Sequence, residues 1–167
     1  PEVAPYPFTT HNPAPGMMTW EDVMIQLIDT PPVAKDYFES YMYGLIRGAD
    51  LVLFVVDLGD DDGIEQCQAV LDKLNSTKTR LATTSYLDEN DIGLSYTQTF
   101  LIANKCDVPG AEDRRQLLQE LCSLEFREII VSAETGDGLD ALRKAVFEEL
   151  DIVRVYSKLP GQKEPDL

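Results

Sequence analysis

The chain has 167 residues, of which 44% are hydrophobic and 26% charged, a composition typical of one globular domain with its own core. A formal net charge of -16 excludes an extended nucleic-acid or anionic-membrane surface within these residues, because phosphate contacts need lysine and arginine. Three cysteines without a Cys-x-x-Cys pair, and no apolar run of the roughly 18 residues that span a bilayer, indicate a reducing cytoplasmic location without a membrane partner.

The first part of the chain predicts a loop followed by a hairpin. Residues 1–16 carry five prolines and no periodicity, so we expect an extended loop. Met17 to Trp20 and Val23 to Ile28 predict two short strands, joined at Glu21 and Asp22, with Asp29 ending the second.

Helices and strands then alternate. Apolar spacing predicts a helix over 37–47, closed by Gly48, a buried strand over 51–56 that ends at Asp57, and a helix over 64–74. Residues 75–98 are polar with little periodicity, so we expect an insertion or exposed connection there, with a short helical turn around 86–91.

The second half continues the alternation. A buried strand over 100–103 is followed by a helix over 112–124, a short strand over 128–132 and a helix over 139–150. This order predicts an α/β fold with a mainly parallel sheet that is covered by helices on both faces. Residues 152–156 predict the first strand of a further unit.

Polar residues follow the strand over 100–103 directly, as Asn104-Lys105-Cys106-Asp107. Ligands bind at the carboxyl edge of open α/β sheets, and a carboxylate at Asp107 can accept hydrogen bonds from the N1–H and exocyclic amine of guanine. Lys105 can lay its methylene stem over a base, and the Asn104 amide can tie neighbouring loops together. Taken alone, the tetrapeptide is equally compatible with a polar turn that binds nothing.

A second turn after a strand reads Ser132-Ala133-Glu134, followed by Gly136 and Gly138. Small residues there let backbone N–H groups approach a ligand closely. The pair of motifs resembles the base-binding half of a GTPase. The resemblance implies that Ala133 offers its N–H to the guanine O6 and that Ser132 supports the Asp107 loop, with Glu134 beside them.

The early segments sharpen the resemblance. Tyr6-Pro7-Phe8-Thr9-Thr10, Pro15-Gly16 and the run over 25–31 resemble the switch regions of the Obg/DRG family of GTPases. The resemblance implies GTP or GDP with Mg²⁺ as cofactors, the metal held by the Thr10 hydroxyl, with Thr9 as the other candidate, and by Asp29 through water. In isolation these three residues are better explained as ordinary loop hydroxyls and a strand-end cap.

Three features depart from the family pattern. The chain contains no G-x-x-x-x-G-K-[ST], so we expect a P-loop NTPase-like sheet without its first strand and P-loop, and a gap between the strands over 23–28 and 51–56. Pro32 stands where the family has a glycine, and proline has no N–H for a γ-phosphate. Val33 cannot orient an attacking water.

The resemblance implies a domain organisation and a function. We expect residues 1–150 to be a partial GTPase domain, and residues 151–167 to begin a TGS-like β-grasp domain. The chain is then a fragment of an Obg/DRG-like protein that binds guanine nucleotide, hydrolyses GTP slowly when full-length, and meets the ribosome or RNA through parts outside this sequence. The alternative is a degenerate, non-hydrolysing guanine-nucleotide-binding or protein-interaction module.

Overall fold

The computed structural model describes residues 12–31, 38–122, 124–153 and 155. The elements within them are β1 (Ala14–Trp20), β2 (Val23–Asp29), α1 (Ser40–Gly48), β3 (Val52–Asp57), α2 (Asp62–Asn75), β4 (Thr79–Ala82), β5 (Tyr86–Leu87), β6 (Ser95–Asn104), α3 (Ala111–Cys122), β7 (Arg127–Ile130) and α4 (Leu139–Glu149). None of the described helices has the length and apolar character that a bilayer-spanning segment needs.

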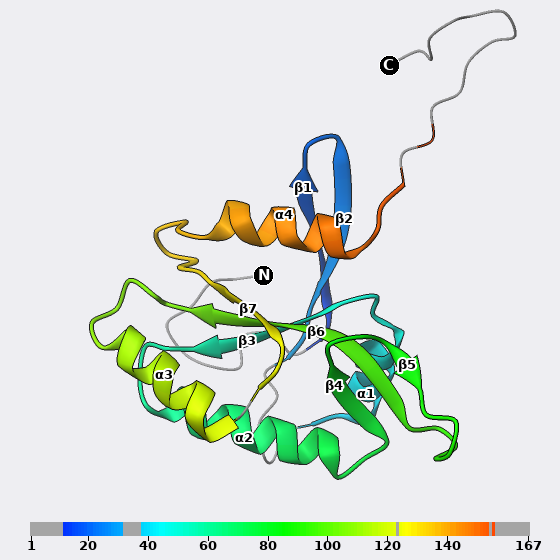
Figure 1. The fold of residues 1–167 in the computed structure, drawn as a ribbon. Coiled ribbons are helices and arrows are strands. Elements are labelled where there is room, and N and C mark those ends of the chain that lie inside the picture. The colour runs from blue at the N-terminus through cyan, green and yellow to red at the C-terminus, as the bar shows by residue number, and fades with distance from the viewer. Residues whose placement is uncertain (1–11, 32–37, 123, 154, 156–167) are drawn as a thin grey trace, which may run out of the picture.

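Strand β6 is the centre of a five-stranded sheet (Figure 1). Its second half pairs in parallel with β3 and with β7, and its first half pairs in parallel with β4 and antiparallel with β5. The predicted α/β fold with a mainly parallel sheet is therefore confirmed. Parallel strands that are buried on both faces read as continuous apolar runs, which is why the sequence revealed β3 and the second half of β6.

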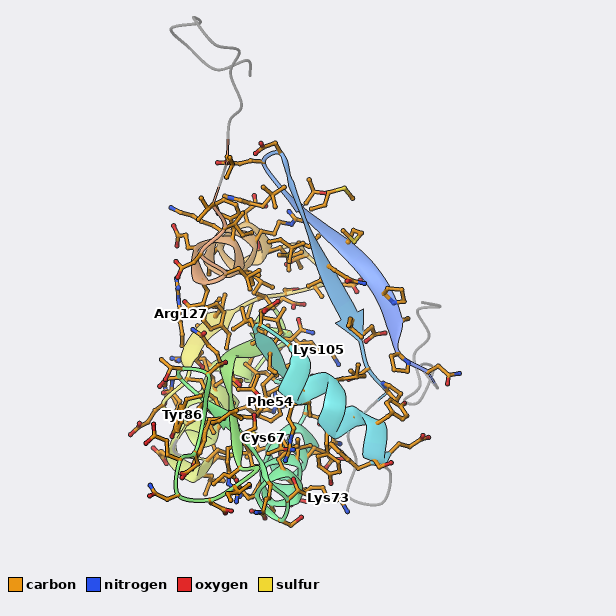
Figure 2. All side chains as sticks on the ribbon, turned by 90° about the vertical axis from the view of Figure 1, so that its right-hand side faces the viewer. Phe54, Cys67, Lys73, Tyr86, Lys105 and Arg127 are labelled. Carbon is orange, nitrogen blue, oxygen red and sulfur yellow. The ribbon has the colours of Figure 1, made fainter. Side chains whose placement is uncertain are left out.

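The two faces of the sheet are covered by different helices, with α2 and α3 along one face and α4 on the other (Figure 1). Alternate residues of β6 supply the two cores, because successive side chains of a strand point to opposite faces. Phe100 and Ile102 belong to the core under α4, whereas Leu101 and Ala103 belong to the core under α2 and α3. In a view from the side, Phe54 and Cys67 lie inside this second core (Figure 2).

Strands β1 and β2 form an antiparallel hairpin that is a separate, two-stranded sheet. Met18 and Ile25 on its inner face are buried with Ala145 and Val146 of α4. Within the described residues β2 pairs with β1, and no hydrogen-bonded strand joins β2 to β3. The hairpin is held by side-chain packing on α4, not by hydrogen bonds to β3.

The prediction for residues 75–98 is wrong in part. A short helical turn was expected around 86–91, whereas the segment forms β4, β5 and the first half of β6. The buried positions of these strands are hydroxyl residues, including Thr79 and Thr97, so the sequence shows no apolar alternation. Tyr86 is fixed in β5 by pairing with Tyr96 of β6.

Two other predictions differ from the structure or lie outside it. Ile152, Val153 and Val155 are the described residues of the strand predicted after α4, and none of them is in a strand. Thr9, Thr10, Pro32 and Val33 lie outside the described residues, as does all but the start of the segment 151–167.

Candidate functional site

The carboxyl ends of three parallel strands meet at one edge of the sheet. Asp57, the last residue of β3, is the register partner of Asn104, the last residue of β6. The next residue on each side continues this contact, since the Leu58 N–H donates to the Asn104 carbonyl at 3.0 Å and the Val131 N–H donates to the Ala103 carbonyl at 2.9 Å. The loops after β3, β6 and β7 are therefore neighbours.

Two hydrogen bonds join the loop after β6 to the loop after β7. The Ala133 N–H donates to the side-chain oxygen of Asn104 at 3.0 Å, and the Cys106 N–H donates to the Val131 carbonyl at 3.2 Å. The Asn104 amide thus ties the two loops, and in this structure the Ala133 N–H that the resemblance assigns to guanine O6 is engaged with Asn104.

Ser132 shapes its own turn. Its side chain is fully buried, and its hydroxyl oxygen accepts a hydrogen bond from the Thr135 N–H at 3.1 Å. Its backbone N–H donates to the Asp137 carbonyl at 2.9 Å, and its carbonyl accepts from the Gly136 N–H at 2.9 Å. The connection to the Asp107 loop runs through the Cys106 and Val131 backbones.

Lys105 has a left-handed backbone, with φ of 66°, and its ammonium lies 2.6 Å from the Asp57 carboxylate. The other oxygen of that carboxylate accepts the Gly59 N–H at 2.7 Å, which fixes its orientation. The hydrogen bond to Asp57 raises the pKa of Lys105, with smaller contributions from the charges of Asp60 and Asp107. Lys105 is therefore held as a cation at this edge.

Glycine at position 59 leaves room for the Lys105 stem and the Asp57 carboxylate in their observed positions. A Cβ there would stand 2.9 Å from the Cδ of Lys105 and 2.8 Å from the Asp57 carboxylate. Sequence reasoning missed both Asp57 and Gly59. The available signal was that Asp57, like Asn104, is a polar residue that ends a buried strand.

Arg114, at the start of α3, also joins the loops. Its guanidinium donates to the Leu58 carbonyl at 3.0 Å, to the Asp61 carboxylate at 2.9 Å and to the Pro109 carbonyl at 3.2 Å. It therefore bridges the loop after β3 and the loop after β6. Nothing in the sequence distinguished it from the neighbouring arginine.

Asp107 and Glu134, the remaining predicted base-site residues, are exposed on the loops after β6 and β7. A carboxylate at such a position is accessible to a ligand that approaches the edge of the sheet. The structure thus brings Asn104, Lys105 and Asp107 together with Ser132, Ala133 and Glu134, as two loops on adjacent strands.

Of the residues predicted for Mg²⁺, only Asp29 is described. It is exposed at the carboxyl end of β2, and its oxygens are suited to a hard cation. No group of three or more acidic, histidine or cysteine side chains within the described ranges is arranged to hold a metal ion. Magnesium binding remains a prediction.

A cavity of about 490 Å³ opens far from this site. Its lining includes Asp50 just before β3, Glu149 at the end of α4, and Met24 and Ile25 of β2. Because it lies at the amino end of β3, it is at the opposite end of the strand from Asp57. We do not assign it to the chemistry of the loops.

Comparison with protein families identifies the domain. Residues 1–105 match the family described as 50S ribosome-binding GTPase. The chain belongs to this family of GTPases.

Curated relatives agree with the assignment and cover nearly the whole chain. Developmentally-regulated G-protein 1 of Arabidopsis thaliana is 26% identical over 99% of this chain and 54% of its own length. An uncharacterized GTP-binding protein of Methanocaldococcus jannaschii is 26% identical over 99% of this chain and 56% of its own length. GTPase Obg of Coprothermobacter proteolyticus is 27% identical over 89% of this chain and 34% of its own length.

These relatives confirm the predicted Obg/DRG membership. The chain spans about half the length of the Arabidopsis and Methanocaldococcus relatives, so the activity of the whole protein does not follow from them.

Solved structures confirm the fold of this GTPase-family domain. The cytosolic domain of the T. maritima FeoB iron transporter in its GDP form has a TM-score of 0.55 and 21% identity, over 92% of this chain and 55% of its own. The GMPPNP form has a TM-score of 0.51 and 19% identity, over 84% of this chain and 52% of its own length. At this identity the likeness concerns the fold alone.

Proposed function

We propose that the loops after β6 and β7 read the guanine base of GTP or GDP. The observation that carries the proposal is the hydrogen bond from the Ala133 N–H to the Asn104 side chain, at 3.0 Å. It joins the two loops that the resemblance to a GTPase assigns to the base of a guanine nucleotide.

The proposed roles follow from the chemistry of the side chains. The exposed Asp107 carboxylate accepts the N1–H and the exocyclic amine of guanine, a donor pair that adenine does not present in that arrangement. A site built around such acceptors rejects the wrong base strongly, because mismatched polar groups are left unpaired. The Lys105 stem, held by Asp57, lies along the base, and the backbone at Ala133 and Glu134 approaches its O6 edge.

For the full-length protein we propose γ-phosphoryl transfer from GTP to water, at a slow rate, through positioning and electrostatics. The 167 residues contain no G-x-x-x-x-G-K-[ST], so we infer that residues beyond this sequence cradle the phosphates. Thr10 or Thr9, together with Asp29, are the proposed Mg²⁺ ligands. Pro32 offers no N–H to a γ-phosphate, so the nucleotide-dependent switch would rely on other groups.

The organisation of the longer protein is also a proposal. We infer a partial GTPase domain over 1–150 and the start of a TGS-like domain over 151–167. The family description supports the ribosome as a partner. Because this chain carries a net charge of -16, contact with ribosomal RNA would involve other parts of the protein. The proposed location of the protein is the cytoplasm.

The base-reading role is tested by replacing the carboxylate of Asp107 with an amide. Asp107→Asn replaces an acceptor by an amide donor, which suits xanthine better than guanine. We expect amide shifts in residues 104–107 and 132–136 with GDP for the unaltered chain, and with xanthosine diphosphate for the variant. Asp113→Asn removes an exposed carboxylate of the same size in the first turn of α3 and serves as the control. A variant that keeps its preference for GDP contradicts the proposal.

A further inference from the structure

Large apolar side chains are exposed where β5 turns into β6. Tyr86 is 50% exposed, Leu87 is 72% exposed and Ile92 is 89% exposed. We call residues 86–92 the β5–β6 tip. Single exposed apolar residues are common, but a group of them within one short turn is typical of an interaction site. Tyr86 lies at the surface in the side view (Figure 2).

The β5–β6 tip is ordered by hydrogen bonds of the Asp88 side chain and of the backbone. The Asp88 carboxylate accepts the N–H groups of Asn90 and Asp91 at 2.8 and 3.0 Å. The Asp88 N–H donates to the Leu94 carbonyl, and the Leu94 N–H donates to the Asp91 carbonyl, both at 3.0 Å. The turn that carries the exposed Ile92 is therefore closed by four hydrogen bonds.

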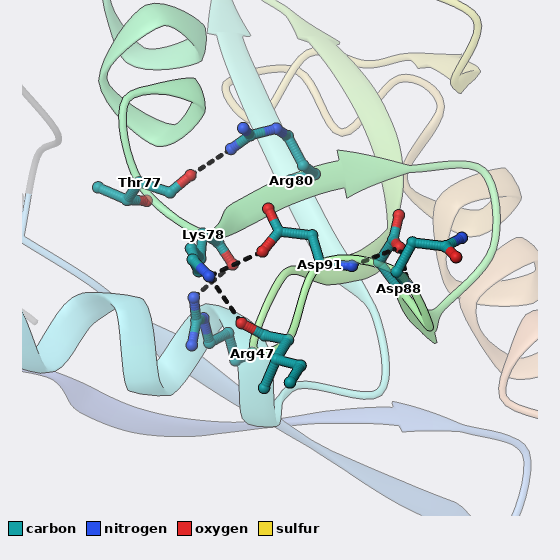
Figure 3. Close-up of polar contacts among 8 residues, drawn as sticks. Arg47, Thr77, Lys78, Arg80, Asp88 and Asp91 are labelled. Atoms are coloured by element: carbon teal, nitrogen blue, oxygen red, sulfur yellow. Dashed lines mark hydrogen bonds and ion pairs between the residues drawn. The ribbon is translucent and has the colours of Figure 1, made fainter.

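Lys78 fastens the tip to the body of the domain (Figure 3). Its ammonium lies 2.7 Å from the Asp91 carboxylate and donates to the Ile92 carbonyl at 2.7 Å. The Lys78 carbonyl in turn accepts from the Arg47 guanidinium of α1, which also donates to the Thr79 hydroxyl at 2.8 Å. The exposed apolar residues are thus presented on a fixed support, so binding a partner costs little ordering of this surface.

An aromatic pair extends the surface along the hairpin. The rings of Tyr86 and Tyr96 are stacked, with centroids 4.2 Å apart and an angle of 8° between the ring planes. The stack fixes the Tyr86 side chain while leaving half of it exposed. Rigid aromatic residues of this kind are enriched at the centres of protein interfaces.

The charge of the β5–β6 tip selects the partner. Asp88, Glu89 and Asp91 lie within it, and no lysine, arginine or histidine occurs between residues 81 and 98. Lys78 neutralises only Asp91. Nucleic acid could stack on the tyrosines, but its phosphates would face these carboxylates, and the adjacent cation, Lys78, is already paired with Asp91.

We propose that the β5–β6 tip docks a basic segment of a partner protein. Leu87, Ile92 and the exposed face of Tyr86 bury apolar side chains of that segment, and its lysines or arginines pair with Asp88 and Glu89. This surface is separate from the nucleotide loops, because it lies at the amino end of β6 whereas Asn104 ends that strand. The proposal does not depend on nucleotide binding.

The test uses a synthetic amphipathic peptide of lysine and leucine, titrated into the isotope-labelled chain while amide shifts are followed. We expect shifts concentrated in residues 86–94. A lysine–serine peptide, which keeps the charge without the apolar side chains, and a glutamate–leucine peptide, which reverses the charge, should bind at least about tenfold more weakly.

Variants distinguish binding at the β5–β6 tip from nonspecific attraction of the basic peptide to an acidic chain. Leu87→Ser with Ile92→Ser should weaken the lysine–leucine peptide at least about tenfold, since both side chains are exposed and their loss leaves the core intact. Leu121→Ser, on α3 and 60% exposed, is the matched control and should leave the affinity unchanged. Shifts centred on residues 57–62, no shift at 86–94, equal binding of the lysine–serine peptide, or preferential binding of a single-stranded oligonucleotide at 86–94 would each overturn the proposal.

Discussion

The Lys105 ammonium lies 2.6 Å from the Asp57 carboxylate, at the carboxyl ends of two adjacent parallel strands. This ion pair holds the central residue of the proposed base-reading loop to a neighbouring strand. Both side chains are nearly half exposed, at 47% and 43%, so solvent screens the pair and its contribution to stability is small. Its main consequence is the position of the Lys105 stem.

Asp57→Asn should therefore change affinity more than stability. We expect the free energy of unfolding to fall by less than about 1 kcal/mol, because an exposed ion pair contributes no more than that. Affinity for GDP should fall several-fold as Lys105 loses its partner. Urea unfolding and a GDP titration measure the two effects. Asp60→Asn is the control, because it removes a negative charge near Lys105 without removing a hydrogen bond to Lys105. Equal losses of affinity in both variants would assign the effect to net charge.

Two glycines within helices should respond to alanine in opposite directions. A Cβ at Gly63 in α2 would stand 2.0 Å from the Asp57 carbonyl oxygen, whereas a Cβ at Gly44 in α1 meets nothing within 4 Å. Gly63→Ala should destabilise the domain by about 2 kcal/mol or more, because the strand end must move. Gly44→Ala should stabilise it by roughly 0.5–1 kcal/mol through helix propensity. Thermal unfolding of the pair tests the packing of α2 under β3, and equal melting temperatures would refute it.

Lowering the pH should reduce the stability of the folded domain, in part because Glu112 becomes protonated. Hydrogen bonds from Arg115 and Gln116 lower the pKa of Glu112 from its usual 4.5 to about 2. A carboxyl whose pKa is lowered on folding stabilises the folded state at pH values above 4.5, and this contribution is lost as the pH falls toward 2. Urea midpoints between pH 5 and pH 2 should decline less in Glu112→Gln than in the unaltered chain. Glu120→Gln, an exposed glutamate of the same helix, should decline as the unaltered chain does.

The sequence predicted the strands and helices whose buried side chains are apolar. The second half of β6 and the strand β3 are uninterrupted apolar runs, and α2, α3 and α4 carry apolar stripes, so periodicity located them within a few residues. Strand β4 and the first half of β6 were missed because their buried positions are hydroxyl residues, and β5 was missed because it has only two residues, both exposed. Thr79, Thr97 and Thr99 are each at most 2% exposed, and such residues in sequence resemble those of a surface loop.

The candidate site was predictable to the level of loops. Polar residues after apolar strands place Asn104, Lys105 and Ser132 at one edge of any parallel sheet. Their partners were not predictable, because the contacts of Lys105 with Asp57 and of Arg114 with Leu58 join residues about 50 positions apart. Such pairings depend on the register of β3 against β6, which composition and periodicity do not specify.

The central claim, that the loops after β6 and β7 read guanine, is tested most directly by titrating the chain with GDP beside ADP and following the backbone amides. The account predicts that GDP shifts the amides of residues 104–107 and 132–136, weakly, since the sequence contains no G-x-x-x-x-G-K-[ST] motif to bind the phosphates, and that ADP at the same concentration does not. Equal shifts with both nucleotides, or none with either, would contradict it.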